Sequence, residues 1–531
     1  MAGQKVGFGS FGLAMKVCML TFFGVFALMG TGGAVAPARP NIILIFTDDQ
    51  GYHDLGCFGS TTIKTPHIDR MASEGLRLTN FYAQPVCGVS RAALMTGSYP
   101  IRVGEPGNRK HLHTVPHPQE ITIAEVLKSA GYATGIIGKW HLGNRGAGPG
   151  GFDPATMPNA QGFDYFYGTP IFNGAKVRVT DTPMRSVIMR NQDVVVPAVQ
   201  NWDQITGDYT REALGWITQH KDQPFFLYLA HNMPHIPLGA SEGFKGKSSN
   251  GPYGDAIEEI DWSTGQLLEK LKELGIDDDT LVVYTSDNGP WIETTAGMKP
   301  GGRAFIPRDH SGSADPLRGW KMSAWDGGCK VPFVARWPKK LRAQRVSDEL
   351  LTTMDLLPTF AKLAGAELPT DRTLDGRDAS PFLLGDADKS PREDYLYFTG
   401  CLLTGVRVAQ WKLVLPRPAN PPGTGWWGRM IEEIKVVQLY DLAADPGEAT
   451  NIADQHPEIV AKLMKHIEAA RAELGDMDVT GSGARLFEAG LRHIGESPSR
   501  KKKTAATGDD AFKPDGKGGY ASSLRLVPPA P

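Results

Sequence analysis

The chain has 531 residues, of which 41% are hydrophobic and 21% are charged, a composition typical of a globular protein with one large domain and a smaller one. Its formal net charge is -2, so no overall basic field is present to hold nucleic acid or an anionic membrane. We therefore expect no nucleic-acid partner, and an anionic substrate would have to be recognised by a local cluster of charges.

The N-terminal segment has the layout of a secretory signal. Lys5 and Lys16 precede the apolar run VCMLTFFGVFALMG, and small residues follow around Ala34 and Ala38. Because the run is shorter than the ~20 apolar residues that span a bilayer, a permanent anchor is the weaker alternative. We expect residues 1–36 to be a signal peptide and the mature chain to be periplasmic or secreted, with no stable membrane anchor.

Four cysteines remain once Cys18 leaves with the signal: Cys57, Cys87, Cys329 and Cys401. None of them forms a pair with metal-site spacing. If Cys87 is chemically special, at most one disulfide remains, and the fold does not depend on a disulfide framework.

Residues 37–384 alternate between short apolar runs and helical patterns. The predicted strands are NIILIFT, YATGIIG, FFLYLA, LVVYT and VPFVA. The predicted helices include TIAEVLKSAG and DAIEEIDWSTGQLLEKLKELG. Thr122 and Glu125 form a capping box at the start of the first of these helices. This alternation indicates an α/β fold in which helices sandwich a large, mainly parallel or mixed sheet. Such sheets bind ligands just beyond the carboxyl ends of their strands.

From about residue 385 the pattern changes. The strand-like pieces DYLYFTG, LTGVRVAQWKLVLP and VVQLYDL lack long intervening helices, and the helical stretch HPEIVAKLMKHIEAARAELG follows them. We expect residues 385–495 to form a smaller C-terminal α+β subdomain on an antiparallel sheet. Residues 496–531 are rich in Lys, Gly, Ser, Ala and Pro, which predicts a disordered tail.

Acidic and amide side chains follow two of the predicted strands. Asp48 and Asp49 come directly after NIILIFT, and Asp287 and Asn288 come after LVVYTS. Adjacent carboxylates repel each other unless a cation or protons intervene, and a set of oxygen ligands suits calcium or magnesium better than zinc. The alternative is that Asp48 and Asp49 cap the next helix.

The segment VCGVSRAALMTGSYP places Cys87 and Arg91 before the helix-like ALMTG. A cysteine near a helix start, with an arginine one turn on, lies in an electropositive place suited to an anionic substrate. The alternative is a small buried cysteine beside a structural arginine.

This segment resembles the sulfatase signature C-x-P-S-R-x-x-L-L-T-G. The chain also carries, in the family's order, PNIILIFTDDQGYHDLGCFGS, TPHIDRMASEG, GKWHLG, NMPHIP, SDNG, LRGWKMSAWDGG and LYDLAADPGEATNIA. From about Pro40 to Ala453 it is similar to formylglycine-dependent arylsulfatases and N-acetylgalactosamine-6-sulfatase-like enzymes of the alkaline-phosphatase superfamily. The resemblance implies an alkaline-phosphatase-like fold and a sulfuric ester hydrolase.

The resemblance further implies hydrolysis of sulfate monoesters by a formylglycine hydrate, through a sulfo-enzyme intermediate. A formylglycine-generating enzyme would make this residue from Cys87. The chemistry fits, since a serine or cysteine sulfate ester would be a stable dead end whereas a hemiacetal sulfate collapses to the aldehyde. One position departs from the signature, because Val89 stands where the family has proline, a residue that the generating enzyme reads.

Site residues follow from the same resemblance. The implied catalytic residues are Cys87, Arg91, Lys139, His141, His235 and Lys321. The implied ligands of one calcium ion are Asp48, Asp49, Cys87 as its formylglycine, Asp287 and Asn288.

Each catalytic residue has an implied role. Arg91 and Lys139 would hold and polarise the formylglycine, and His141 would take a proton from it. His235 and Lys321 would bind sulfate and protonate or stabilise the leaving oxygen. Lys139 and His141 stand two apart after a strand, so in an extended chain they would share a face.

The expected substrate is a sulfated carbohydrate or aryl sulfate, with sulfated polysaccharide or glycosaminoglycan preferred. Two alternatives remain: an unconverted, inactive sulfatase-like protein that binds glycans, and a phosphate or phosphonate monoester hydrolase. Loop residues are candidates for contacts to the sugar, namely Arg303, Arg308, His310, Trp426 and Trp427.

Overall fold

A computed structural model describes residues 39–103, 116–144, 146–171, 173, 177–178, 183–184, 186–299, 302–305, 310–421, 428, 431–477 and 479–485. They belong to one compact unit that begins at Arg39. The predicted signal peptide 1–36 and tail 496–531 lie outside these ranges, as do Arg308, Trp426 and Trp427.

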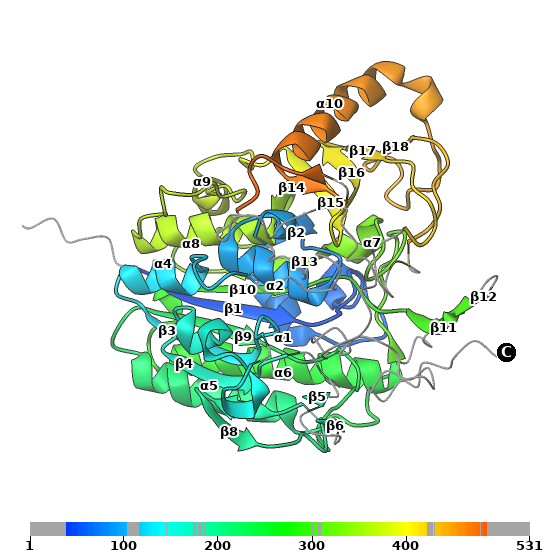
Figure 1. The fold of residues 1–531 in the computed structure, drawn as a ribbon. Coiled ribbons are helices and arrows are strands. Elements are labelled where there is room, and N and C mark those ends of the chain that lie inside the picture. Colours follow the sequence, from blue (N-terminus) through cyan, green and yellow to red (C-terminus); the bar gives the residue numbers. More distant parts are fainter. Residues whose placement is uncertain are drawn as a thin grey trace, which may run out of the picture. The chain divides into compact units, whose positions relative to one another are not determined.

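A ten-stranded sheet forms the core of the unit (Figure 1). Its order across the sheet is β14 (Arg345–Thr352), β2 (Leu76–Tyr82), β13 (Lys330–Arg336), β10 (Thr280–Ser286), β1 (Asn41–Thr47), β9 (Phe225–Ala230), β3 (Ala133–Lys139), β4 (Tyr165–Thr169), β7 (Ile188–Arg190) and β8 (Asp193–Val196). The predicted strands NIILIFT and FFLYLA match β1 and β9 at both ends.

The sheet is mixed. Strands β10, β1, β9, β3 and β4 run parallel to one another. β13 runs antiparallel to β10 and β2, and β7 and β8 form an antiparallel edge beyond β4. The parallel centre aligns the carboxyl ends of β10, β1, β9 and β3 at one edge of the sheet, where ligands bind in such folds.

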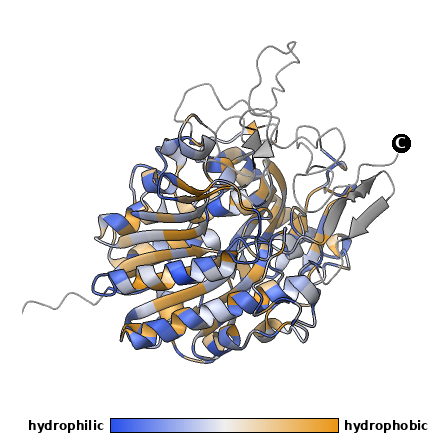
Figure 2. Cartoon of the chain, turned by 90° about the horizontal axis from the view of Figure 1, so that it is seen from below, coloured by the Kyte–Doolittle hydropathy of each residue, from blue (hydrophilic) through white to orange (hydrophobic). Residues whose placement is uncertain are grey.

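Helices cover both faces of the sheet because both faces are apolar. In β1, Ile42, Leu44 and Phe46 pack on one side with α2 (Cys87–Thr96), α4 (Ile123–Ser129), α8 (Leu356–Ala364) and α9 (Ser380–Leu384). Ile43 and Ile45 pack on the other side with α1 (Pro66–Ser73), α5 (Ile205–His220) and α6 (Gly251–Glu273). Figure 2 shows the apolar strands between helices that carry both polar and apolar residues. Thr122 and Glu125 form the predicted capping box at α4.

A second, four-stranded antiparallel sheet follows in the chain, as predicted. It consists of β15 (Asp394–Thr399), β16 (Leu402–Val408), β17 (Trp411–Val414) and β18 (Gln438–Asp441). The helix α10 (Pro457–Glu473) packs on it through Leu463 and Ile467, which are buried among strand residues such as Val406 and Leu413. The short helix α3 (Pro100–Val103) adds Ile101 to the same cluster.

Buried charges join this sheet to the segment before β13. Lys412 of β17 lies 3.2 Å from Asp326 Oδ1 and 2.5 Å from Glu448 Oε1, and all three side chains have at most 1% exposure. Tyr397 also donates to Asp326 Oδ1 at 2.6 Å. Asp326 begins α7 (Asp326–Cys329), so this network fixes the region that follows Lys321.

None of the four cysteines that the structure describes forms a disulfide. Three antiparallel pairs complete the described strands: β5 (Val177–Arg178) with β6 (Pro183–Met184), β11 (Glu293–Lys299) with β12 (Gly302–Phe305), and β19 (Gly475–Asp476) with β20 (Val479–Thr480). Within the described ranges, none of the helices has the length and apolar character needed to cross a membrane.

Candidate active site

The polar residues that follow the parallel strands meet at one edge of the sheet. β1 lies between β10 and β9, and β9 lies beside β3. Asp48 and Asp49 therefore lie next to Asp287 and Asn288, which follow β10. Asp49 has a φ of 64°, a left-handed conformation that non-glycine residues adopt rarely and that is frequent at functional sites.

Hydrogen bonds connect these two strand ends directly. The Asp49 amide donates to Asp287 Oδ1 at 3.3 Å, and Asn288 Nδ2 donates to Asp49 Oδ1 at 2.8 Å. The Asp287 amide donates to the Thr47 carbonyl at 3.1 Å. All of these acidic and amide side chains are buried, so their charges are held away from water.

Each of the three carboxylates has a cationic partner. The nitrogen-to-oxygen distances are 2.7 Å for Arg91 with Asp287, 2.5 Å for Lys139 with Asp48 and 2.6 Å for Lys321 with Asp49. Arg91 also donates through Nη1 to the Lys139 carbonyl at 2.8 Å and to the Tyr228 hydroxyl at 3.2 Å. The structure thus brings three predicted cations to three predicted metal ligands.

Burial and charge move the pKa values of these carboxyls in opposite directions. Burial would raise the pKa of Asp48, but the positive charges of Lys139, Arg91 and Lys321 outweigh it and hold this pKa well below its usual range. Burial and the neighbouring Asp48 charge raise the pKa of Asp287 to about 7. Among the described groups, Asp287 therefore lacks enough positive charge nearby to be firmly ionised.

The donor set fits a hard cation. Three buried side-chain oxygens accept no hydrogen bond: Asp48 Oδ1, Asp49 Oδ2 and Asn288 Oδ1. Ligand atoms of Asp48, Cys87 and Asp287 lie within 4.8 Å of one another, as do those of Asp48, Asp49 and His235. A divalent cation would satisfy these oxygens, and an oxygen-rich set of this kind suits calcium.

Cys87 is the first residue of α2, and not a residue ahead of the helix as the sequence suggested. The helix starts after Val86, which is extended and provides no side-chain cap. Cys87 is 4% exposed, and burial raises the pKa of its thiol despite the nearby charges of Lys139 and Lys321. An unmodified thiol here is therefore mostly protonated at neutral pH and a weak nucleophile.

The two predicted catalytic histidines lie beyond β3 and β9. Lys139 is the last residue of β3, but His141 has a φ of 60°, so the extended path that the sequence suggested for these two residues is wrong. His235 Nε2 lies 3.6 Å from Asp49 Oδ2, and its Nδ1 lies 2.5 Å from the Ile236 carbonyl. Burial lowers the pKa of His235 to about 4, so its imidazole is neutral at pH 7.

Two asparagines that the sequence did not single out hold the His235 loop. Asn173 donates through Nδ2 to the carbonyls of Asn232, at 2.9 Å, and His235, at 3.3 Å. The side-chain amide of Asn232 donates through Nδ2 to Asn173 Oδ1, and Asn232 Oδ1 accepts from the Tyr209 hydroxyl at 2.7 Å. The position of Asn232 after a buried strand was a usable signal, whereas Asn173 stands in a loop without one.

We predict that Asn173→Ala displaces His235 without unfolding the protein. Leaving two buried carbonyls without donors costs about 1–3 kcal/mol, and kcat is expected to fall by about tenfold or more because each 1.36 kcal/mol is a factor of ten. If the chain has the sulfatase activity that the resemblance implies and His235 protonates the leaving oxygen, kcat for phenyl sulfate should fall more than kcat for para-nitrophenyl sulfate, whose leaving group needs less help.

Asn159→Ala is the matched control, since Asn159 also donates to a loop carbonyl, that of Phe163, at 3.2 Å. Equal losses of kcat on both substrates, or the same losses in both variants, would contradict a role for Asn173 in placing His235.

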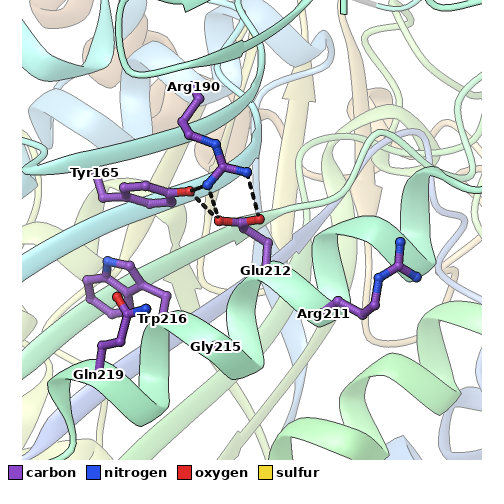
Figure 3. A pocket seen from close by; sticks show the side chains of 7 residues that line it. All are labelled: Tyr165, Arg190, Arg211, Glu212, Gly215, Trp216 and Gln219. Atoms are coloured by element: carbon purple, nitrogen blue, oxygen red, sulfur yellow. Dashed lines mark hydrogen bonds and ion pairs between the residues drawn. The ribbon is translucent and has the colours of Figure 1, made fainter. Parts of the chain in front are cut away.

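A hollow lies at the other end of β4 from the Cys87 site. It has a volume of about 170 Å³ and is lined by Tyr165, Arg190, Arg211, Glu212, Gly215, Trp216 and Gln219 (Figure 3). Tyr165 is the first residue of β4, whereas Thr169 at its other end pairs with Lys139. Arg190 lies 2.7 Å from Glu212, so its charge is already balanced, and we assign the chemistry to the Cys87 site.

Comparison with known proteins gives a consistent result. The Sulfatase family matches residues 40–366, and the family described as N-sulphoglucosamine sulphohydrolase, C-terminal, matches residues 320–415. The chain is 33% identical to human steryl-sulfatase, with 82% of this chain and 88% of the relative covered. It is also 33% identical to N-acetylgalactosamine-6-O-sulfatase of Bacteroides thetaiotaomicron, with 82% and 93% covered.

Solved structures share the fold. The crystal structure of Ps i-CgsB in complex with k-i-k-neocarrahexaose superposes with a TM-score of 0.65 at 28% identity, covering 81% of this chain and 92% of that one. The alkaline-phosphatase-like architecture expected from the sequence is thereby confirmed.

Proposed function

The chain belongs to the sulfatase family and is a sulfuric ester hydrolase, and on this premise we propose that it cleaves sulfate monoesters of carbohydrates with a formylglycine made from Cys87. The observation that carries the proposal is the convergence of Arg91, Lys139 and Lys321 with three buried carboxylates around this cysteine. A formylglycine-generating enzyme would be the partner that modifies Cys87 before the chain folds.

The hydrate of formylglycine supplies two hydroxyls on one carbon, one to attack sulfur and one to expel sulfate afterwards. Lys139 and Arg91 lie on the nucleophile's side of the site, where their charges favour the deprotonated hydroxyl. His141 takes the proton of the hydroxyl that expels sulfate. Arg91 is held in this position by its hydrogen bonds to Asp287, to the Tyr228 hydroxyl and to the Lys139 carbonyl.

On the other side of the sulfate, His235 and Lys321 act on the leaving alcohol. Their side chains converge on Asp49, at 3.6 Å and 2.6 Å. As the bond from sulfur to the ester oxygen breaks, negative charge develops on that oxygen. Lys321 stabilises this charge, and His235 acts from its protonated form, whose Nε2 proton passes to the leaving oxygen.

Asp48, Asp49, Asp287 and Asn288 would hold one calcium ion together with a formylglycine oxygen. The support for this assignment is that three of these residues have buried oxygens without a hydrogen bond. When bound, calcium supplies positive charge that stabilises the sulfate oxygens in the transition state.

We further propose a sulfated polysaccharide or glycosaminoglycan as the natural substrate. Relatives support a sugar, since one is named N-acetylgalactosamine-6-O-sulfatase and a structural neighbour was solved with k-i-k-neocarrahexaose. In this proposal residues 37–384 form the catalytic domain, 385–495 the C-terminal subdomain, and the mature protein is periplasmic or secreted.

The test is the mass of the tryptic peptide 78–91 from protein purified from its native host, together with hydrolysis of para-nitrophenyl sulfate. We expect the peptide to be lighter, because conversion of the thiol to the aldehyde exchanges hydrogen sulfide for one oxygen, and we expect the enzyme to turn over the aryl sulfate. Val89, which replaces the usual proline, is the reason to examine conversion directly. An unmodified thiol with no turnover would favour the alternative of a glycan-binding protein without activity.

A further inference from the structure

One indole ring lies against both residues proposed to act on the leaving oxygen. Trp291, five residues beyond β10, is half-buried. The Lys321 Nζ lies 4.9 Å from the centroid of its ring, and the His235 ring lies 6.0 Å away at an angle of 74°. Trp291 therefore borders the two residues that we propose to act on the leaving oxygen.

Trp291 also belongs to an apolar cluster around Cys87, which we call the apolar collar. Its members are Val86, Cys87, Val89, Met322 and Ile431, with Trp291 and Leu402 packed against them. The first five are at most 5% exposed, whereas Trp291 and Leu402 are only partly buried. Trp291 is thus the largest side chain of the collar that is not fully buried.

The position of the leaving oxygen brings its substituent to this ring. A donor reaches an oxygen at about 3 Å, so an oxygen bound by Lys321 or His235 lies near the indole. The carbon attached to that oxygen must then pass along the aromatic surface. Pockets of this kind orient a ligand by a few polar groups and hold it by aromatic contact.

We propose that Trp291 forms the wall of the leaving-group subsite and selects substrates in which the sulfate is carried on or next to a ring with an apolar face, such as a pyranose. This inference rests on the proposed function of the Cys87 site. It predicts that Trp291 contributes to binding of the sulfated ring and not to binding of the sulfate group itself.

The experiment compares Trp291→Leu and Trp291→Phe with the unchanged protein. For Trp291→Leu we expect KM for para-nitrophenyl sulfate to rise by about tenfold, the effect of losing one aromatic contact. The kcat for the same substrate should change by less than about threefold, because the lost contact is worth about one factor of ten at most. Trp291→Phe should recover most of the loss. Trp411→Leu is the control, because Trp411 is also half-buried but lies in β17 against His456.

Binding of inorganic sulfate separates this role from a structural one. Calorimetry on the Cys87→Ala background should give an unchanged Kd for sulfate and a weaker Kd for para-nitrophenyl sulfate when Trp291→Leu is added. An unchanged KM, or a Kd for inorganic sulfate that rises in parallel, would overturn the inference. If the unchanged protein hydrolyses no sulfate ester, the proposed function fails instead, and the calorimetric comparison still decides the role of Trp291.

Discussion

A Cys87→Ser variant is expected to release one alcohol per enzyme molecule and then stop. The serine hydroxyl would occupy the start of α2, within the same cluster of Asp48 and Asp287, and could accept the sulfuryl group. The resulting ester has no second hydroxyl on its carbon, so it cannot collapse to an aldehyde and expel sulfate. Steady-state turnover should fall by about 10⁶-fold, the scale seen when the nucleophile is removed from a set of catalytic residues that act together.

The measurement combines rapid mixing with para-nitrophenyl sulfate and the mass of peptide 78–91 afterwards. A burst of one equivalent, with one sulfuryl group added to that peptide, is the expected result. Cys87→Ala is the control and should give neither burst nor adduct. Sustained turnover by Cys87→Ser without an aldehyde on the peptide would contradict the proposed mechanism.

The environment of Cys87 gives a reason to expect that this residue acts only after modification. Burial raises the pKa of the Cys87 thiol, although Lys139 and Lys321 oppose the shift. The unmodified residue is therefore neither a good nucleophile nor able to release sulfate once it has reacted.

Much of the fold and of the site's charge was predictable because parallel strands end at one edge. The sequence located β1, β9 and β10 and the polar residues that follow them, and neighbouring strands must bring such residues together. The antiparallel direction of β13 was not predictable, since a fully buried strand carries no signal of its direction. The start of α2 at Cys87 was missed because Val86 provides no cap.

Finer placement in the site depended on tertiary contacts. The φ of 60° at His141 and the hydrogen bonds between Asn173 and the His235 loop involve loops whose sequences have no periodicity. Trp291 likewise gave no sign in sequence that it would lie against Lys321, which is thirty positions further along the chain. Residues that position a catalytic group are thus harder to predict than the group itself.

The charges of the buried site nearly cancel, and we therefore expect anion binding to depend on the proposed calcium ion. When all three are ionised, Asp48, Asp49 and Asp287 contribute three negative charges, and their partners Arg91, Lys139 and Lys321 contribute three positive ones, a sum of zero. Because the pKa of Asp287 is about 7, the site without calcium carries between zero and one positive charge at pH 7. His235 adds none at pH 7, because burial lowers its pKa to about 4. One calcium ion would raise the sum to two, which attracts a sulfate ester of charge minus one.

Calcium removal is therefore expected to abolish substrate and product binding together. Turnover should fall by about 10³-fold on chelation, the scale of losing electrostatic stabilisation of the transition state, and calorimetry should detect no sulfate binding until calcium is returned. Asp48→Asn should weaken calcium binding by about a hundredfold or more, since even indirect supports of a metal site are worth 10–100-fold.

Asp54→Asn is the matched control for this experiment. Asp54 is also fully buried just beyond β1, but its Oδ2 accepts from Gly51 and Tyr253, both at 2.7 Å, and it is not among the proposed ligands. The calcium affinity of the Asp54→Asn variant should equal that of the unchanged protein. If the chelated enzyme bound sulfate as tightly as the calcium form, the three cations would suffice by themselves, and the paired carboxylates would serve only to hold Arg91, Lys139 and Lys321 in place.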